Sequence, residues 1–367
     1  MGTLMKSTGV LALGRLLVGG CLLVAQGGQQ ASPPDNRDPL KVSVTEDGAV
    51  DVPAMQVPMS KFLSPEGKAY VDYHLHANLA PRQPEVKKGV PALIASYIDR
   101  QKTLFAVDLE DTQIGGVHTY VYSPREGVSA ANLHRVLIDL HGGGFSNCWP
   151  ACAELESRPI AGLGRIKVVS VDYREQPEFK HPAASEDVAK VYSELLKSYK
   201  PSEIGIYGCS AGGMLTAMSV AWFQAHNLPR PGAIGILCAG AGGFGGDSAY
   251  IATVLGEGRF IPAMAGGDVK GLSYFSDADP NDPLVTPLVS KDVLAKFPPT
   301  LLVTGTRSME MSSTVYTHAQ LVKVGVDAEL HVWEGMFHGF FYNPDVPESR
   351  ECYDVIVNFF NKHLASK

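Results

Sequence analysis

The stretch that most constrains the fold is residues 203–213, a short apolar run that ends in a glycine-flanked serine. The run is typical of a buried strand, residues 208–212 carry the pattern G-x-S-x-G, and the small residues that follow open a helix. Gly208 and Gly212 relieve crowding in the sharp turn between strand and helix. Such a turn holds the hydroxyl of Ser210 clear of its own backbone, at the positive end of the helix dipole. In a chain with 38 glycines the motif alone is weak, so its sequence context decides its meaning.

Two further segments give the motif that context. Residues 136–140 form a second buried-strand pattern, which runs directly into His141 and three consecutive glycines. H-G-G-G after a strand is the oxyanion-hole loop of lipases and esterases, because glycines let backbone N–H groups face a ligand without obstruction. Far downstream, His338 stands in a glycine-flanked loop after another strand pattern. The order of donor loop, serine and histidine is the one that an α/β-hydrolase requires.

Taken together, these segments resemble the bacterial hormone-sensitive-lipase-like esterases. The resemblance runs from about residue 115 to the C-terminus and rests on H-G-G-G at 141–144, a Y-R…P-E…P-A…D run at 173–187, G-C-S-A-G-G at 208–213 and H-G-F at 338–340. It implies an α/β-hydrolase fold, with a mainly parallel central sheet flanked by helices and a helical cap over the active site. It also implies a carboxylic ester hydrolase for short- to medium-chain acyl groups on small alcohols, which needs no cofactor.

The same pattern assigns roles to individual residues. Ser210 is the expected nucleophile, and it needs an adjacent base because a hydroxyl at its free pKa is a poor nucleophile. His338 is the expected base and, later in the reaction, the acid that protonates the leaving alcohol. The backbone N–H groups of Gly142, Gly143 and Ala211 are the expected oxyanion hole.

The acid of the triad departs from the family's pattern. The resembled family has an aspartate after the penultimate strand, and the residue at that position here is Ser308. Glu310 is the only carboxylate between Thr300 and Val326, so it is the favoured acid. The alternative is a catalytically weakened, ligand-binding protein, as among the plant gibberellin receptors, because loss of the acid lowers the rate of a serine protease about 10⁴-fold. An amidase or lactonase acting through the same site is a further alternative.

The N-terminal residues differ in composition from the rest. Residues 1–31 have the pattern of a secretory signal peptide: Lys6 and Arg15 precede an apolar run of about ten residues, and a polar stretch with small residues follows. The run is too short to span a bilayer, which takes about 20 apolar residues. We therefore expect a secreted or periplasmic protein without a membrane span. V-G-G-C at 18–21 also resembles a lipobox, which leaves a lipid anchor at Cys21 open.

The remaining chain divides into two parts. Residues 32–114 are expected to form an extended lead-in and an N-terminal cap segment, with helical spacing around 90–105. Residues 115–367 are expected to form the catalytic domain, with a cap insertion near 240–278, because apolar strands alternate with helices as in a covered parallel sheet. Strands are expected at 117–122, 136–140, 168–171, 203–207, 233–238, 300–304 and 328–332, and helices at 184–198, 211–226, 311–324 and 349–364.

Partners and cofactors follow from what the sequence lacks. The net charge of −7 is mild, and no basic cluster favours a nucleic acid partner. The cysteines match no zinc pattern and the glycine-rich stretches match no nucleotide loop, so we expect neither metal nor cofactor. The expected partner is a small-molecule ester, and a homodimer stays open. Cys148 and Cys152 lie in the loop after the donor motif, where a disulfide is one of two alternatives.

Overall fold

The computed structural model describes residues 42–365, except 81–85, 88–89, 263–266 and 268. The expected signal peptide at 1–31 and Cys21 therefore lie outside the described residues. None of the helices described combines the length and the apolar character needed to cross a bilayer.

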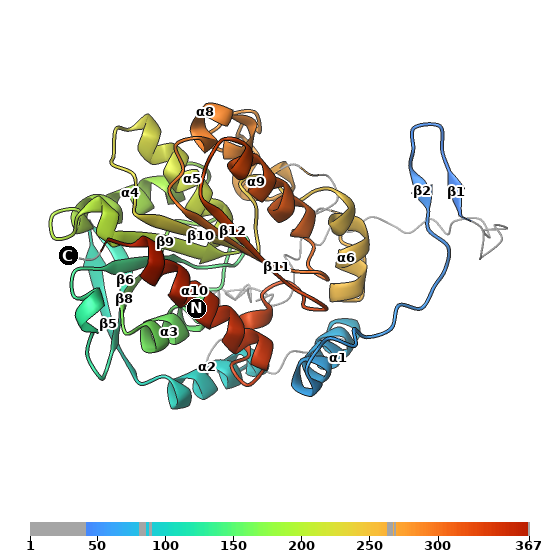
Figure 1. Cartoon of the computed structure of the whole chain (residues 1–367), viewed down its shortest axis with the longest axis horizontal. Coiled ribbons are helices and arrows are strands. Elements are labelled where there is room, and N and C mark those ends of the chain that lie inside the picture. The colour runs from blue at the N-terminus through green and yellow to red at the C-terminus, as the bar shows by residue number, and fades with distance from the viewer. Residues whose placement is uncertain (1–41, 81–85, 88–89, 263–266, 268, 366–367) are drawn as a thin grey trace, which may run out of the picture.

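An eight-stranded sheet forms the centre of the protein (Figure 1). The strand order is β12-β11-β10-β9-β7-β8-β6-β5; the six strands from β12 to β8 are parallel, and β6 and β5 are antiparallel at one edge. This is the predicted α/β-hydrolase fold. The strands are β5 (Val107–Ile114), β6 (Val117–Pro124), β7 (Val136–Leu140), β8 (Lys167–Val171), β9 (Ile204–Cys209), β10 (Ala233–Leu237), β11 (Thr300–Gly305) and β12 (Ala328–Trp333).

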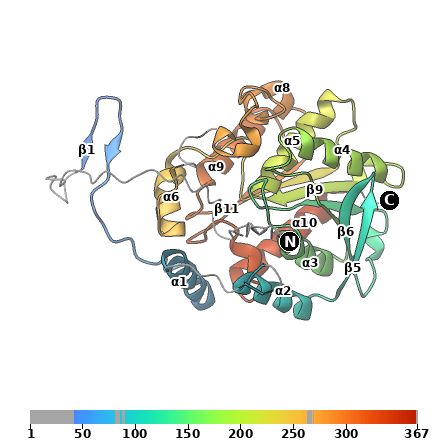
Figure 2. The same ribbon diagram turned by 180° about the vertical axis from the view of Figure 1, so that it is seen from behind.

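The sheet is covered on both faces, as its unbroken apolar strands require. Alternate residues of one strand enter different cores: on β7, Ile138 packs on one face and Leu137 on the other. Helices α4, α5 and α9 cover the first face, α3 and α10 cover the second, and α2 packs against α3 (Figures 1 and 2). Their bounds are α2 (Ala92–Leu104), α3 (Ala151–Gly164), α4 (Ala183–Leu195), α5 (Ala211–Ala225), α9 (Met311–Lys323) and α10 (Pro347–His363).

Two of the longer elements that contact the sheet were not expected from the sequence. β5 lies before residue 115, where the alternation was predicted to start. Its V-D-L-E-D-T-Q-I sequence is mostly polar because most residues of this edge strand are exposed, so it lacks the apolar pattern of the inner strands. α3 follows the H-G-G-G loop, where no helix was expected. Almost all of its residues are buried and Pro159 lies inside it, so it lacks the apolar stripe by which a surface helix is recognised.

The remaining elements lie beside the sheet domain. α1 (Pro65–Leu79) packs against α6 (Asp247–Glu257), so parts of the two segments expected to form a cap are in contact. Asn78 of α1 donates to Glu257 of α6 at 3.0 Å. The short strands β1 (Ser43–Val44) and β2 (Val50–Asp51) pair with each other and project away from the sheet (Figure 1). The short elements still to be given are β3 (Val86–Lys87), β4 (Val90–Pro91) and α8 (Lys291–Leu294).

Candidate active site

Ser210 occupies the turn between β9 and α5. Its backbone has φ 58° and ψ −119°, a conformation that a residue with a side chain rarely adopts. The turn lies against the carboxyl end of β7: a Cβ on Gly208 would stand 2.3 Å from the Leu140 carbonyl oxygen, and one on Gly212 would stand 1.6 Å from it. Both glycines of the motif are therefore required by the close approach of two backbones.

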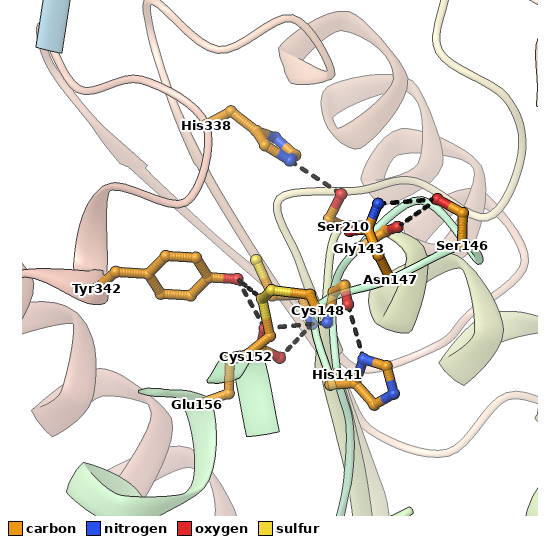
Figure 3. The surroundings of a disulfide bond; sticks show 12 residues. His141, Gly143, Ser146, Asn147, Cys148, Cys152, Glu156, Ser210, His338 and Tyr342 are labelled. Carbon is orange, nitrogen blue, oxygen red and sulfur yellow. Dashed lines mark hydrogen bonds between the residues drawn. A yellow bond between two sulfur atoms is a disulfide. The ribbon is translucent and has the colours of Figure 1, made fainter. Parts of the chain in front are cut away.

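The hydroxyl of Ser210 meets an imidazole from a distant loop (Figure 3). His338 follows β12, and its Nε2 lies 2.9 Å from Ser210 Oγ. Its Nδ1 lies 2.9 Å from Glu310 Oε2. Because the carboxylate only accepts hydrogen bonds, Nδ1 carries the proton and Nε2 accepts from the hydroxyl. The structure thus brings together Ser210, His338 and Glu310, the three residues expected to form the triad.

Glu310 reaches the histidine from the first turn after β11, at the N-cap of α9. Its side chain is fully buried, and its second oxygen accepts a 3.0 Å hydrogen bond from Thr304 Oγ1. Ser308, at the family's usual aspartate position, is also buried, but its Oγ has no hydrogen-bond partner among the described residues. The longer side chain of Glu310 therefore occupies the place beside His338.

The buried pair shifts the pKa values of both partners. Burial alone would raise the pKa of Glu310, but the charge and hydrogen bond of His338 lower it below its usual value. Burial alone would lower the pKa of His338, but the charge and hydrogen bond of Glu310 outweigh it and raise that pKa to about 9. Cys238 and Glu257 act in the same direction. A buried carboxylate beside the imidazole has the position and the charge expected of the third group of a hydrolytic triad.

These shifts predict an acid limb in the pH dependence of kcat/KM for an activated ester. Only neutral His338 can take the proton of Ser210, so kcat/KM is expected to rise about tenfold per pH unit up to a pKa near 9, then level off. Glu310→Gln removes the largest cause of the raised pKa, so its residual activity should show the limb at lower pH.

Initial rates corrected for spontaneous hydrolysis measure this profile. Glu257→Gln should move the limb in the same direction by less, because the charge of Glu257 contributes less to the pKa of His338. Glu329→Gln is the control: the carboxylate of Glu329 accepts a hydrogen bond from Lys362, so its removal should leave the limb at the wild-type pH. A wild-type limb at or below the ordinary histidine pKa of about 6.5 would contradict the prediction.

The structure corrects one residue of the predicted oxyanion hole. The N–H of Gly142 donates to Glu156 Oε1 at 3.0 Å, so the assignment of Gly142 as a donor to substrate is wrong. Within the described residues, the N–H groups of Gly143, Gly144 and Ala211 make no hydrogen bond. These three N–H groups are therefore unpaired there, and Gly144 replaces Gly142 among the expected donors. The sequence motif contains all three glycines and does not show which N–H is already engaged.

The loop after the donors is fixed by a covalent link. Cys148 and Cys152 form a disulfide, with Cα atoms 5.4 Å apart, which ties this loop to the first turn of α3 (Figure 3). Sequence reasoning left this pairing open and missed Glu156, one turn further along α3, together with its partner Tyr342. No motif marks either residue, because their contact joins segments 186 residues apart.

The described residues offer one group that could hold a metal. Ligand atoms of Cys238, Glu310 and His338 all lie within 4.8 Å of one another. Both ring nitrogens of His338 are already hydrogen-bonded, to Glu310 and to Ser210. A metal there would have to replace one of these bonds, so the geometry suits proton transfer better than metal binding.

Comparison with known proteins points in the same direction as the geometry. A family model described as alpha/beta hydrolase fold matches residues 137–342. An acetyl-hydrolase of Streptomyces hygroscopicus is 26% identical over 257 residues, which cover 67% of this chain and 82% of that protein. The carboxylesterase/phospholipase LipF of Mycobacterium tuberculosis is 31% identical over 247 residues, 65% of each chain.

Solved structures give the same picture. The crystal structure of an esterase, E25, superposes with a TM-score of 0.71 at 28% identity, over 86% of this chain and 99% of that one. An esterase of the bacterial hormone-sensitive lipase family superposes with a TM-score of 0.69 at 24% identity, over 84% of this chain and all of that one. The second likeness is evidence for the fold alone.

Proposed function

The chain belongs to the alpha/beta hydrolase family and is a carboxylic ester hydrolase of the hormone-sensitive-lipase-like group; from this premise we propose that it hydrolyses short- to medium-chain esters through an acyl-serine intermediate. The observation that carries the proposal is the hydrogen-bond chain from Ser210 through His338 to Glu310, with 2.9 Å at each contact. A nucleophile, its base and the group that orients the base are thus within bonding reach before substrate binds.

In the first half-reaction, Ser210 Oγ attacks the ester carbonyl carbon while its proton passes to His338 Nε2. The carbonyl oxygen becomes an oxyanion, and the N–H groups of Gly143, Gly144 and Ala211 are placed in this proposal to stabilise it. Collapse of the tetrahedral intermediate expels the alcohol, which takes the proton from His338, and leaves an acyl group on Ser210. Water then attacks the acyl carbon while His338 Nε2 takes its proton. The second tetrahedral intermediate collapses, His338 returns the proton to Ser210 Oγ, and the carboxylic acid is released.

The weakened, ligand-binding alternative rests on Ser308 at the usual acid position. The position of Glu310 argues against this alternative, because its buried carboxylate, hydrogen-bonded to His338 Nδ1, supplies the charge that Ser308 lacks. Among the residues that the structure describes, none favours an amide or a lactone over an open-chain ester. A secreted or periplasmic location, a lipid anchor at Cys21 and a homodimer stay proposals from sequence.

The substrate class is tested with p-nitrophenyl esters from acetate to dodecanoate, together with a matched anilide and a lactone. We expect kcat/KM to be highest for acyl groups of about two to eight carbons. It should be at least tenfold lower for the anilide and the lactone, because p-nitrophenolate is a better leaving group than an aniline or the alkoxide of a lactone. A folded protein that hydrolyses no activated ester, and whose Ser210 does not react with a fluorophosphonate, would overturn the proposal. Faster turnover of the anilide or the lactone would reassign the substrate.

A further inference from the structure

A buried carboxyl group lies beneath the active site and receives hydrogen bonds from three different segments (Figure 3). Glu156 of α3 is 2% exposed. Its Oε1 accepts from the N–H of Gly142 at 3.0 Å and from the hydroxyl of Tyr342 at 2.7 Å. Its Oε2 accepts from the N–H of Cys209 at 3.2 Å.

Each of these three donors adjoins a group of the proposed reaction. Gly142 immediately precedes Gly143, the first open donor of the oxyanion loop, and Cys209 immediately precedes Ser210. Tyr342 ends the short 3₁₀ helix Phe340–Tyr342, which begins two residues after His338. One side chain therefore contacts the oxyanion loop, the nucleophile turn and the histidine loop at once.

The surroundings of Glu156 make these contacts hard to replace. Burial raises the pKa of Glu156 well above its usual value, the charge of Asp139 adds to this, and the three donors oppose it. Among the described residues, no arginine or lysine forms an ion pair with Glu156. A polar group this deeply buried is tolerated because it is hydrogen-bonded, so the three donors and the carboxyl stabilise one another.

We propose that Glu156 is a positioning residue for ester hydrolysis, whose carboxyl group sets the spacing of the oxyanion loop, Ser210 and the His338 loop; this rests on the function proposed above. The Cys148–Cys152 disulfide also links the segment after the oxyanion loop to α3, the helix that carries Glu156. Cys152 lies one turn before Glu156 on α3, and its Sγ is 3.8 Å from the Tyr342 hydroxyl.

The proposal makes a specific prediction for Glu156→Gln. The amide keeps the size of the side chain but offers one oxygen instead of two, so at least one of the donors from Gly142, Cys209 and Tyr342 loses its acceptor. Displacement of these segments by a fraction of an ångström should lower kcat about 10- to 100-fold, because alignment of reacting groups is steeply distance-dependent. KM should stay within about twofold, since the side chain of Glu156 is buried and its oxygens accept hydrogen bonds from Gly142, Tyr342 and Cys209.

The experiment compares kcat and KM on p-nitrophenyl butyrate, Ki for a trifluoromethyl ketone, which mimics the tetrahedral intermediate, and Tm. The matched control is Glu154→Gln on the same helix: Glu154 is also buried, but among the described residues the ion pairs of its carboxylate are with Arg158 and Lys102. We expect Glu156→Gln to raise Ki in proportion to its loss of kcat/KM. Glu154→Gln should lower Tm with kcat and Ki close to wild type.

The outcomes separate a positioning role from a merely structural one. The proposal is overturned if Glu156→Gln keeps the kcat and Ki of the wild type. It is also overturned if Glu156→Gln and Glu154→Gln lose the same Tm and the loss of kcat in Glu156→Gln is no larger than that in Glu154→Gln. If Glu156→Gln does not fold, Tyr342→Phe is measured instead, because it removes one donor and leaves the carboxyl group in place. A several-fold loss of kcat at unchanged KM in Tyr342→Phe supports the proposal, and wild-type kinetics overturn it. A wild-type protein inert to all esters would instead overturn the proposed function, and the role of Glu156 with it.

Discussion

Replacement of Ser210 by alanine is expected to lower kcat on a p-nitrophenyl ester by about six orders of magnitude, as loss of the nucleophile does in a serine protease. Without Ser210 Oγ no acyl-enzyme can form. His338 Nε2, which lies 2.9 Å from Oγ in the wild type, then has no hydroxyl to deprotonate. Residual turnover would come from the oxyanion donors and from substrate binding alone. Steady-state kinetics at a pH where wild-type His338 is mostly neutral, near pH 9.5, measure the loss most directly.

The matched control is Ser219→Ala, another buried serine, on the helix that follows the nucleophile. Its hydroxyl donates to the Leu215 carbonyl within α5, so it touches none of the reacting groups. This variant should keep kcat within about twofold and should still react with a fluorophosphonate, whereas Ser210→Ala should be unlabelled. Turnover by Ser210→Ala within tenfold of wild type would show that another group attacks the ester.

The second large effect is expected for Glu310→Ala, about a 10⁴-fold loss of kcat, as for loss of the acid in a serine protease. The imidazolium formed in the transition state would lack its buried carboxylate, and Nδ1–H would lose the acceptor that fixes the tautomer. Glu310→Gln should be similarly impaired, because it keeps the size of the side chain and removes its charge. Glu334→Gln is the control, a solvent-exposed carboxylate in the loop before His338.

Ser308→Asp separates the two interpretations of the acid position. If Glu310 is the acid, this change should not raise the activity of the wild type, and it should restore part of the activity only when combined with Glu310→Ala. A large gain from Ser308→Asp alone would mean that the natural site lacks an effective acid. Near-normal turnover by Glu310→Ala would rule Glu310 out.

The sequence was most informative where the chemistry is local. A serine on a strand-to-helix turn needs glycines on both sides, and the contacts of Gly208 and Gly212 with the β7 carbonyl show why. The unbroken apolar strands likewise predicted a covered parallel sheet. β5 and α3 were not predicted. β5 is a polar edge strand and α3 is buried on nearly all sides, so neither shows the usual periodicity of apolar residues.

The parts of the site that sequence could not supply depend on long-range contacts. Glu310 could be named only as the favoured acid, since its reach to His338 is set by how β11 turns into α9. The choice of Gly144 over Gly142 depends on Glu156, which belongs to no motif and whose partners lie 14, 53 and 186 residues away in the sequence. A motif specifies which groups a loop contains, and the packing around the loop decides where they point.

The disulfide beside the oxyanion loop has a practical consequence for the laboratory. Cysteine pairs oxidise in the bacterial periplasm or outside the cell and are kept as thiols in the cytoplasm. Protein purified from the cytoplasm of an expression host would thus carry free thiols at Cys148 and Cys152, while protein exported from the same host would carry the bond. Batches made by these two routes differ in chemical composition next to the reaction centre, and assays on them compare two molecular species.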